Sequence, residues 1–150
     1  MDDRELGLVE IEDRIKLKKV DLGLTSLKRT PIVPVSERDL PCILIHEGDD
    51  TVIAYSQRTQ NGYPMTRQLE VILEIITKSD VDIKALYRNL RSVVFSEKGS
   101  DPQVFNARLV PGNKTTFIRE NHTEGPTGNG LPSILSMRLV LDLIYVDGGL

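Results

Sequence analysis

The chain has 150 residues, of which 39% are hydrophobic, 27% charged and 5% aromatic, and it contains no Trp. This size predicts a single domain over residues 1–150 that can bury a core without metal or disulfide support. Acidic residues outnumber Lys and Arg by 22 to 19, for a net charge of -3. That balance argues against tight binding to nucleic-acid phosphates.

The cysteine content and the N-terminus exclude further classes of protein. Cys42 is the only cysteine, so there is no internal disulfide framework and no CxxC metal or redox motif. We expect Cys42 to behave as a small core hydrophobe. The chain opens with Met-Asp-Asp-Arg-Glu, and no apolar run approaches the ~18 residues of a membrane span. The sequence therefore predicts a protein of a cytoplasm-like medium with no membrane partner.

The first predicted elements are a helix and a linker. Apolar residues recur at helical spacing among charged ones from Leu8 to about Leu27. Pro31 and Pro34 then favour an extended connector over residues 30–40, because each Pro disfavours helical geometry in the residue before it.

A hairpin and a long strand are predicted next. The runs 42–46 and 51–56 are rich in β-branched residues, and the four residues Glu47-Gly-Asp-Asp50 between them are typical of a hairpin loop. Residues 65–77 then alternate over the whole segment. One predicted face holds Leu69, Val71, Leu73 and Ile75, and the other holds Glu70, Ile72, Glu74 and Ile76.

The second predicted helix has the clearest pattern. Ser79 or Asp80 can cap it, and Ser79 with Asp82 resembles a weak capping box. Its apolar stripe consists of Ile83, Leu86, Tyr87, Leu90, Val93 and Val94.

An excursion over residues 96–132 is punctuated by Gly and Pro and separates this helix from the final strand. Within it, residues 104–110 and 115–120 are predicted to pair with each other as a protruding hairpin. Residues 133–146 alternate again and predict a closing strand. The order of elements predicts an α+β fold: a mixed, mostly antiparallel sheet with helices packed on it and a protruding long loop or hairpin.

Motifs for catalysis are scarce. There is no HExxH, GxSxG, phosphate loop or dinucleotide fingerprint. Asp49 and Asp50 in the predicted turn are similar to the carboxylates that hold magnesium in RNA polymerases, although a solvated turn explains them in a chain this short. Residues 125–130 are favoured as a flexible loop rather than a phosphate cradle, and His46 and His122 lack metal-ligand spacing.

The two long strands leave a second sheet face with mixed side chains. It holds the apolar Ile72, Ile76, Val140, Ile144 and Val146 and the charged Glu70, Glu74, Arg138 and Asp142. Such a face is too apolar for free solvent and too charged for an ordinary core, so we expect a partial cover. Either the N-terminal helix or another copy of the chain would provide it. Arg138 is a candidate cross-strand partner for the acidic side chains.

The order of these elements and their amino-acid sequences resemble those of the tail terminator proteins of long-tailed bacteriophages. The resemblance spans nearly the whole chain and is one of layout, without a diagnostic motif. It rests on the N-terminal helix, Asp39-Leu-Pro-Cys-Ile43, the strand from Arg67 to Ile75, the helix from Asp80, the excursion, and the closing strand from Met137 to Tyr145.

The resemblance implies a non-enzymatic subunit, without cofactor or metal, that forms a hexameric ring on the tail tube, stops tube growth and joins tail to head. Its partners would be copies of itself, the tail tube protein and a head-tail connector or stopper protein. DNA would pass through the lumen without specific binding, in agreement with the negative net charge. Glu70 and Glu74 are candidates for the lumen wall, unless their face lies between subunits. The protein would be assembled in the host cytoplasm and located in the tail or neck of the virion.

The excursion is the candidate for one of the two matching patches that a cyclic ring requires. Its aromatic and Arg side chains, of the types that interfaces favour, are Phe105, Arg108, Phe117 and Arg119. A solvated, exposed loop is the alternative for this segment.

The residues leave other functions open. A head-closure or neck connector component of the same virion would work through similar surfaces. A small metal-dependent enzyme would use Asp49 and Asp50. A host ligand-binding or adaptor domain would use the excursion as a lid.

Overall fold

The computed structural model describes residues 2–29, 37–55, 65–78, 81–95, 103–104, 107–112, 116–121 and 134–147. Three long strands of 14 residues each dominate it: β2 (Cys42–Tyr55), β3 (Met65–Lys78) and β7 (Ile134–Asp147). The described residues form two α-helices, α1 (Asp3–Leu17) and α2 (Ile83–Phe95). The shorter elements are β1 (Ser26–Arg29), the 3-10 turn η1 (Glu37–Asp39), β4 (Gln103–Val104), β5 (Ala107–Pro111) and β6 (Thr116–Asn121).

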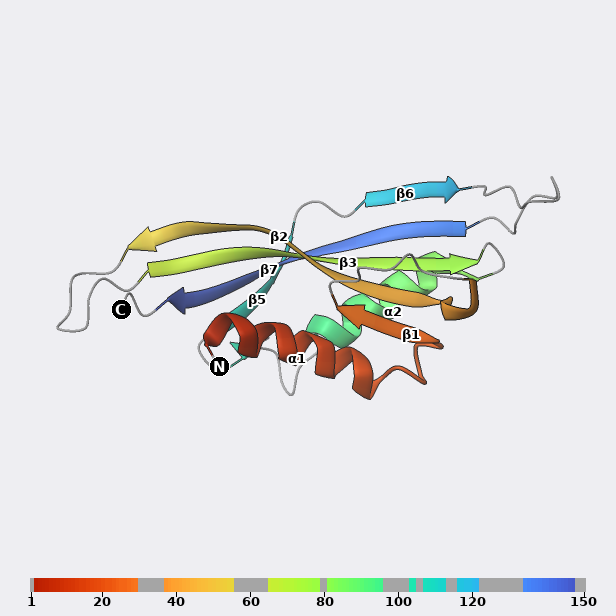
Figure 1. The fold of residues 1–150 in the computed structure, drawn as a ribbon, viewed down its shortest axis with the longest axis horizontal. Coiled ribbons are helices and arrows are strands. Elements are labelled where there is room, and N and C mark those ends of the chain that lie inside the picture. Colours follow the sequence, from red (N-terminus) through yellow and green to blue (C-terminus); the bar gives the residue numbers. More distant parts are fainter. Residues whose placement is uncertain are drawn as a thin grey trace.

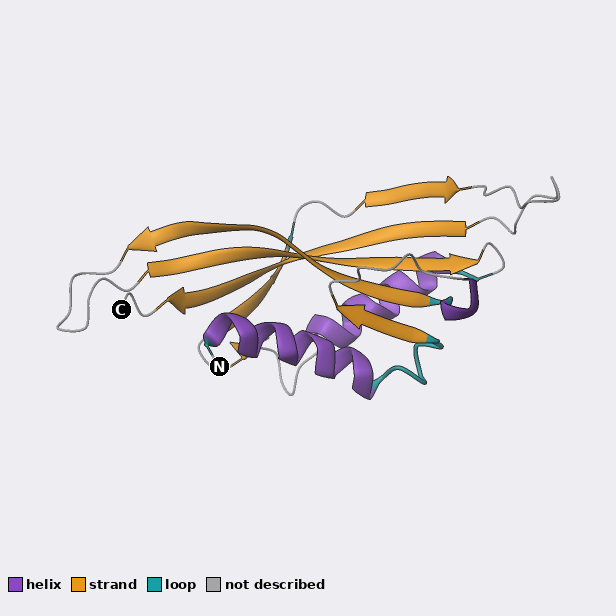
Figure 2. Cartoon of the chain, in the orientation of Figure 1, coloured by secondary structure: helices purple, strands orange, loops and turns teal. Residues whose placement is uncertain are grey.

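The strands form one mixed sheet in the order β1-β2-β3-β7-β5-β4, and β6 pairs with another part of β7. Only the β1–β2 pair is parallel among the described strands. From top to bottom in Figure 1, the order of β2, β3 and β7 reverses between the two ends, which reflects a strong twist. The fold is α+β with helices packed on a mostly antiparallel sheet, as the sequence predicts (Figure 2).

The main core lies between the two helices and one face of the sheet. Alternate residues of β3 are buried, because successive side chains of a strand point to opposite faces. The largest fully buried side chains come from both helices and from β2, β3, β5 and β7: Leu8, Ile11, Ile15, Ile43, Ile45, Leu69, Leu73, Ile75, Leu90, Leu109, Leu139 and Leu141. The predicted alternation in the two long strands is therefore confirmed.

Helix α1 begins and ends earlier than predicted. Asp2 caps it by accepting a hydrogen bond from the Glu5 amide at 2.8 Å, so the helix starts at Asp3. After Leu17 the chain turns, and Gly23 adopts a positive φ of 69° that side chains rarely tolerate. The prediction of a helix to about Leu27 is therefore wrong, because residues 26–29 instead form β1 along β2.

Helix α2 agrees with the predicted stripe. Ile83, Leu86, Leu90 and Val94 are buried, and Tyr87 and Val93 pack partly buried against the same core. The Asp82 carboxylate accepts a hydrogen bond from the Ala85 amide at 3.1 Å and so caps the helix. The capping candidates Ser79 and Asp80 lie outside the described residues.

The predicted hairpin within the excursion is wrong. Strands β5 and β6 do not pair with each other; both pair antiparallel with β7, β5 along residues 141–144 and β6 along residues 134–138. Between them, the Gly112 amide donates to the Val140 carbonyl at 2.9 Å. Strand β7 is long enough to satisfy the backbone of both segments in succession, which offers more pairing than an isolated hairpin.

Gly7 is required by the close approach of α1 to the sheet. A Cβ added there would lie 2.5 Å from one terminal methyl group of Leu143 on β7 and 2.8 Å from the other. Gly7→Ala normally favours a helix, but here we expect overpacking to destabilise the fold by about 1–3 kcal/mol. Denaturant unfolding of this variant beside Asp13→Ala, at an exposed position of the same helix, provides the measurement. An unfolding midpoint for Gly7→Ala equal to or above that of the parent would contradict the close packing.

Candidate functional site

Both helices of the described residues cover the same sheet face, and most of the other face has no described helix packed on it (Figure 1). One buried cluster joins Ile11 of α1 and Leu90 of α2 to Leu143 of β7. The N-terminal helix therefore does not cover the second face, so that alternative is wrong. The reason is that the apolar stripe of α1 packs beside α2, and Gly7 brings this helix against β7.

One end of the second face carries a small core of its own. Leu40 packs with the buried Cys42 and Leu44, and Ile76 and Ile134 lie partly buried against them. Cys42 is fully buried, and burial raises the pKa of its thiol to about 11. The prediction that Cys42 is a core hydrophobe is confirmed. We call the rest of this face, along β3 and β7, the open face.

A polar cluster lies on the open face around Glu74. Its carboxylate is 3.2 Å from His46 Nε2, accepts a hydrogen bond from Ser136 Oγ at 3.4 Å and lies 3.8 Å from Arg138 Nε. Arg138 is also the register partner of Glu74 across β3 and β7. The predicted cross-strand charge pair is therefore confirmed, and neighbouring strands compensate the charge of Glu74.

This cluster is not arranged for nucleophilic catalysis. A serine nucleophile needs a base that contacts its hydroxyl and is oriented by a carboxylate. Here Glu74 lies between Ser136 and His46, so the carboxylate occupies the place of the base. The geometry holds strands together and offers no activated hydroxyl.

The remainder of the open face is apolar and acidic. Ile72 and Val140 are register partners; Ile72 is half-buried, and Val140 is 5% exposed. Glu70 and Asp142 are also directly opposite each other, so two acidic residues meet across β3 and β7. Like charges in this position disfavour the pairing. A surface that mixes apolar and charged side chains in this way is typical of one that is partly covered.

The segment Gly48-Asp49-Asp50 does not form the predicted turn. Strand β2 is continuous from Cys42 to Tyr55, with an irregularity in its pairing to β3 between Glu47 and Asp50. A β-bulge of this kind accommodates extra residues within a strand and redirects their side chains. The hairpin prediction is therefore wrong, because β2 pairs along its length with the equally long β3.

Asp50 is instead the centre of a network that joins three other elements. Its carboxylate accepts hydrogen bonds from the Tyr145 hydroxyl at 2.5 Å, Arg67 Nε at 3.0 Å and Arg4 Nε at 3.1 Å. Arg4 also pairs with Glu47 at 2.7 Å. The network therefore ties the start of α1 to β2, β3 and β7 at a half-buried position, where charge-assisted bonds are strong.

The network changes the proton affinity of its members. Burial raises the pKa of Asp50, but hydrogen bonds from Tyr145 and Arg67 outweigh it, so the pKa lies below the usual value. Burial and the hydrogen bond to Asp50 raise the pKa of Tyr145 to about 12. At neutral pH the carboxylate is charged and the phenol retains its proton, which is the combination that this hydrogen bond requires.

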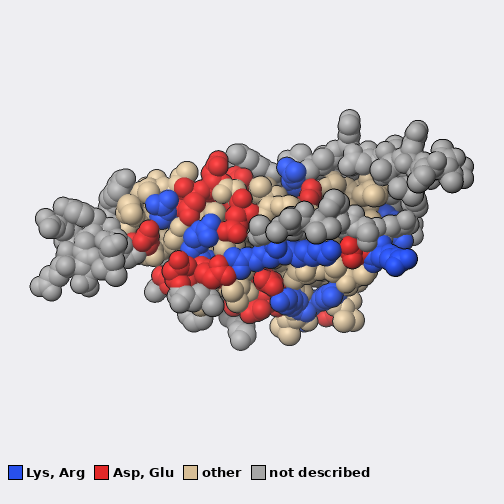
Figure 3. All heavy atoms as spheres, in the orientation of Figure 1, with Lys and Arg blue, Asp and Glu red and all other residues tan. Residues whose placement is uncertain are grey.

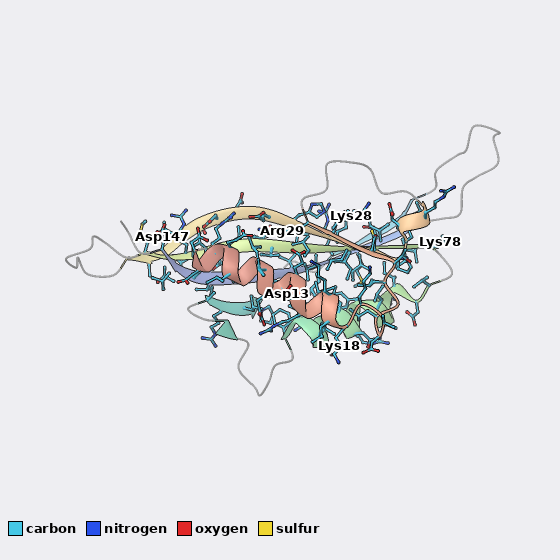
Figure 4. The ribbon with its side chains drawn as sticks, turned by 60° about the horizontal axis from the view of Figure 1, so that its bottom comes forward. Asp13, Lys18, Lys28, Arg29, Lys78 and Asp147 are labelled. Atoms are coloured by element: carbon cyan, nitrogen blue, oxygen red, sulfur yellow. The ribbon has the colours of Figure 1, made fainter. Side chains whose placement is uncertain are left out.

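Charged side chains hold the parallel edge strand β1 in place. Arg29 forms a bidentate pair with Glu5 of α1, with N–O distances of 2.6 and 2.7 Å, and Lys28 lies 3.1 Å from Asp39. Figure 4 labels Lys28 and Arg29 on this strand. Figure 3 shows acidic and basic side chains intermingled over α1 and the neighbouring strands. Two of the pairs in this region are Arg29 with Glu5 and Lys28 with Asp39. This view shows no uniformly basic surface.

The four predicted interface residues stay a hypothesis. Phe105 lies outside the described residues, and Arg108 is exposed on β5, opposite Ile144 of β7. Phe117 and Arg119 lie on β6, where the structure describes the backbone pairing alone. Strands β5 and β6 place these three positions along one edge of β7 rather than at the tip of a hairpin. His122 and residues 125–130 also lie outside the described part.

Sequence reasoning placed Val146 on the second face but missed the other exposed large apolar residues of the described part. Leu17 is 81% exposed and Val20 is 90% exposed at the end of α1, whereas Ile53 is 49% and Val146 is 43% exposed on the long strands. Leu17 and Val20 do not continue the buried stripe of Leu8, Ile11 and Ile15, and this break in the pattern was the available signal. The Asp50 network was also missed, because its members are far apart in the chain.

Comparisons with known proteins identify no family. No family model matches the chain, and no curated protein does. A solved structure described as the virion of a native gene transfer agent particle is similar at 15% sequence identity and a TM-score of 0.42, covering 91% of this chain and 92% of the other. This similarity does not assign a function. No helix in the described ranges is long and apolar enough to cross a membrane.

The Asp50 network predicts a specific acid sensitivity. Because the folded-state pKa of Asp50 is lowered, its contribution is present above the unfolded-state value near 3.8 and is lost as the pH falls through the folded-state pKa. We expect Asp50→Asn to cost about 1–3 kcal/mol at pH 7 and much less in strong acid. Unfolding free energies measured across this pH range, with the exposed neighbour variant Asp49→Asn as control, provide the test. Equal losses for the two variants would contradict the network.

The same contacts predict that Mg²⁺ and Ca²⁺ do not stabilise the fold through Asp50. Arg4, Arg67 and Tyr145 already occupy its carboxylate, and the described residues include no group of three or more potential ligands that could hold a metal ion. Melting curves with and without millimolar divalent cation should therefore coincide. A metal-induced rise in Tm that disappears in the Asp49→Asn, Asp50→Asn double variant would restore the metal hypothesis.

Proposed function

We propose that this chain is a virion structural protein, a tail terminator that forms a hexameric ring, caps the tail tube, stops its polymerisation and joins tail to head. The observation that carries the proposal is the open face of the sheet. Both helices pack on the opposite face, and half-buried Ile72 and Ile144 lie on the open face among charged residues. A face of this composition is characteristic of a surface that another protein covers.

The charged groups support a role in assembly rather than catalysis. Glu74 pairs with the cation of Arg138 and lies 3.2 Å from His46 Nε2, and Asp50 is held by Arg4, Arg67 and Tyr145. These groups are used to join strands and helices. What the molecule offers to partners is shape, apolar area and local charge.

The layout of the fold supports the particular role. An N-terminal helix, a long strand beginning at Met65, a helix capped at Asp82 and a closing strand ending at Asp147 follow in the order on which the resemblance to tail terminators rests. The segment after Pro41 differs from the expected layout, since it forms one long strand instead of a hairpin.

Under this proposal, residues 1–150 work as one unit in the tail or neck of a virion assembled in the host cytoplasm. Its partners are copies of itself, the tail tube protein and a head-tail connector or stopper protein. DNA passes the ring without specific binding, for which the net charge of -3 is suitable. Phe105, Arg108, Phe117 and Arg119 are proposed contacts of the excursion, and Arg108 is exposed on β5.

The proposal predicts sixfold rings. We expect purified protein at high concentration, or protein mixed with tail tubes, to form rings that electron microscopy and native mass spectrometry detect as hexamers. Protein that stays monomeric at all concentrations and never binds a tube would contradict the proposal.

A substitution on the open face tests whether this face is needed for ring formation. Ile72→Lys places a charge in the centre of that face, where burial by a partner would leave the charge unpaired. We therefore expect the affinity of ring formation or tube binding to fall about tenfold or more. Asn89→Lys adds the same side chain at an exposed position of α2 and serves as the matched control. Both variants should keep the circular dichroism spectrum of the parent. Undiminished assembly of Ile72→Lys would contradict a functional role for the open face.

A further inference from the structure

We propose that the exposed side of α2 binds the phosphate backbone of double-stranded DNA without reading its sequence. This inference goes beyond the function proposed above, because it assigns a surface of the chain to DNA and does not depend on ring formation. It begins from the exposed residues of α2, which are Lys84, Arg88, Asn89, Arg91 and Ser92. Three of these side chains are cations, two are neutral hydrogen-bonding groups, and none is acidic or apolar.

The three cations form one line along the helix, which we call the cationic stripe. Lys84 and Arg88 are four residues apart, and Arg88 and Arg91 are three apart, so each lies one turn from the next on the same side of α2. At a rise of 1.5 Å per residue the stripe is about 10 Å long. The opposite side of α2 is buried in the main core, so the stripe faces solvent.

The charge of the stripe is not neutralised within the described part of the chain. Helix α2 contains no Asp or Glu, and among the described residues no salt bridge involves Lys84, Arg88 or Arg91. The Arg91 guanidinium lies 5.7 Å from the centre of the Phe95 ring, a contact that leaves its charge in place. The acid that precedes the helix, Asp82, uses its carboxylate as the cap. Helix α1 differs, because two of its cations pair with acidic residues one turn earlier.

Helix stability does not explain this pattern. Like charges one turn apart repel each other, and the stripe contains two such pairs, Lys84 with Arg88 and Arg88 with Arg91. Lys84 also lies in the first turn of α2, where the positive end of the helix dipole disfavours a cation, although Arg91 is better placed near the other end. Part of the charge on this side is therefore unfavourable in the free protein, and a bound polyanion would relieve the repulsion.

The residue types fit phosphate groups better than they fit a protein surface. Lys, Arg, Asn and Ser are side chains through which proteins contact the phosphate oxygens of DNA. A protein interface is centred on aromatic or apolar anchors, and the exposed residues of α2 include none. Phosphate contacts carry no information about the bases, so the binding is expected to be independent of sequence.

The net charge of the chain limits the strength of this contact. The chain as a whole carries a charge of -3, so the attraction comes from the local field of α2 and not from the molecule at a distance. We therefore expect a Kd of about 10⁻⁴ to 10⁻⁶ M, the range of sequence-independent binding. A contact this weak is compatible with DNA that moves past the protein.

Salt dependence of DNA binding tests the stripe. Fluorescence anisotropy of a labelled duplex, titrated with the protein over a salt series, should give a plot of log K against log salt with a slope of about -2.7, since three phosphates are neutralised. The triple variant Lys84→Gln, Arg88→Gln, Arg91→Gln should bind about tenfold or more weakly and lose most of this slope. Asn89→Lys adds a cation beside the stripe and should strengthen binding and steepen the slope.

A second triple variant is the matched control. Lys16→Gln, Lys18→Gln, Lys19→Gln removes the same amount of positive charge from the chain, but at the end of α1, where Lys16 and Lys18 lie beside acidic residues. We expect this variant to bind DNA nearly as well as the parent. The substituted positions of both variants lie outside the core, so both should keep the circular dichroism spectrum of the parent and melt close to it.

Several results would overturn the inference. These are no binding by the parent at low salt, equal losses in the two triple variants, and a clear preference between duplexes of unrelated sequence. Polyglutamate that binds the stripe more tightly than DNA at the same salt concentration would instead indicate an acidic protein as the partner.

The outcomes also separate this inference from the proposed function. A protein that binds DNA through the stripe but never forms rings or binds tubes would contradict the terminator proposal and support the DNA contact. Rings formed by a parent protein that does not bind DNA would leave the terminator proposal standing and overturn the contact.

Discussion

The mismatch in length between strands and helices governs the rest of this structure. Three paired strands of 14 residues each outreach both helices, which pack side by side on one face. The helices build a closed core over part of that face, while no helix of the described ranges covers the other face or the projecting strand ends. Because apolar residues occur in both places, the folded chain presents surfaces that are better satisfied by a partner than by water.

Two clusters of polar side chains hold the long strands to each other, and one of them also holds α1. Asp50 joins α1 to β2, β3 and β7 close to where the helical layer ends, and Glu74 joins β2, β3 and β7 on the open face. Each carboxylate is compensated by side chains from neighbouring elements, so the long strands stay in register. A rigid sheet is the property that an assembly subunit needs, since its partners must meet surfaces of constant shape.

The proposed function requires one small subunit to contact several different partners. Under this proposal, a ring on a tube must contact two neighbours, the tube and the head side, and the open face lies opposite the face on which both helices pack. Edge strand β1 is held by Arg29 and Lys28 through pairs with Glu5 and Asp39, and such basic edges discourage indiscriminate strand pairing.

The sequence by itself determined the α+β class, β3, β7 and the stripe of α2, because hydrophobic period is a local property of each segment. It offered Arg138 as a candidate partner for the acidic side chains, and the tertiary structure decided that this partner is Glu74. The candidate site was predictable only in part: the mixed second face was recognised, but not what covers it. The end of α1, the existence of β1, the continuity of β2 and the pairing of β5 and β6 with β7 were decided by the tertiary structure. Each depends on backbone partners distant in the chain, as does the network that links Arg4 to Tyr145, and no local pattern reports which distant strand supplies them.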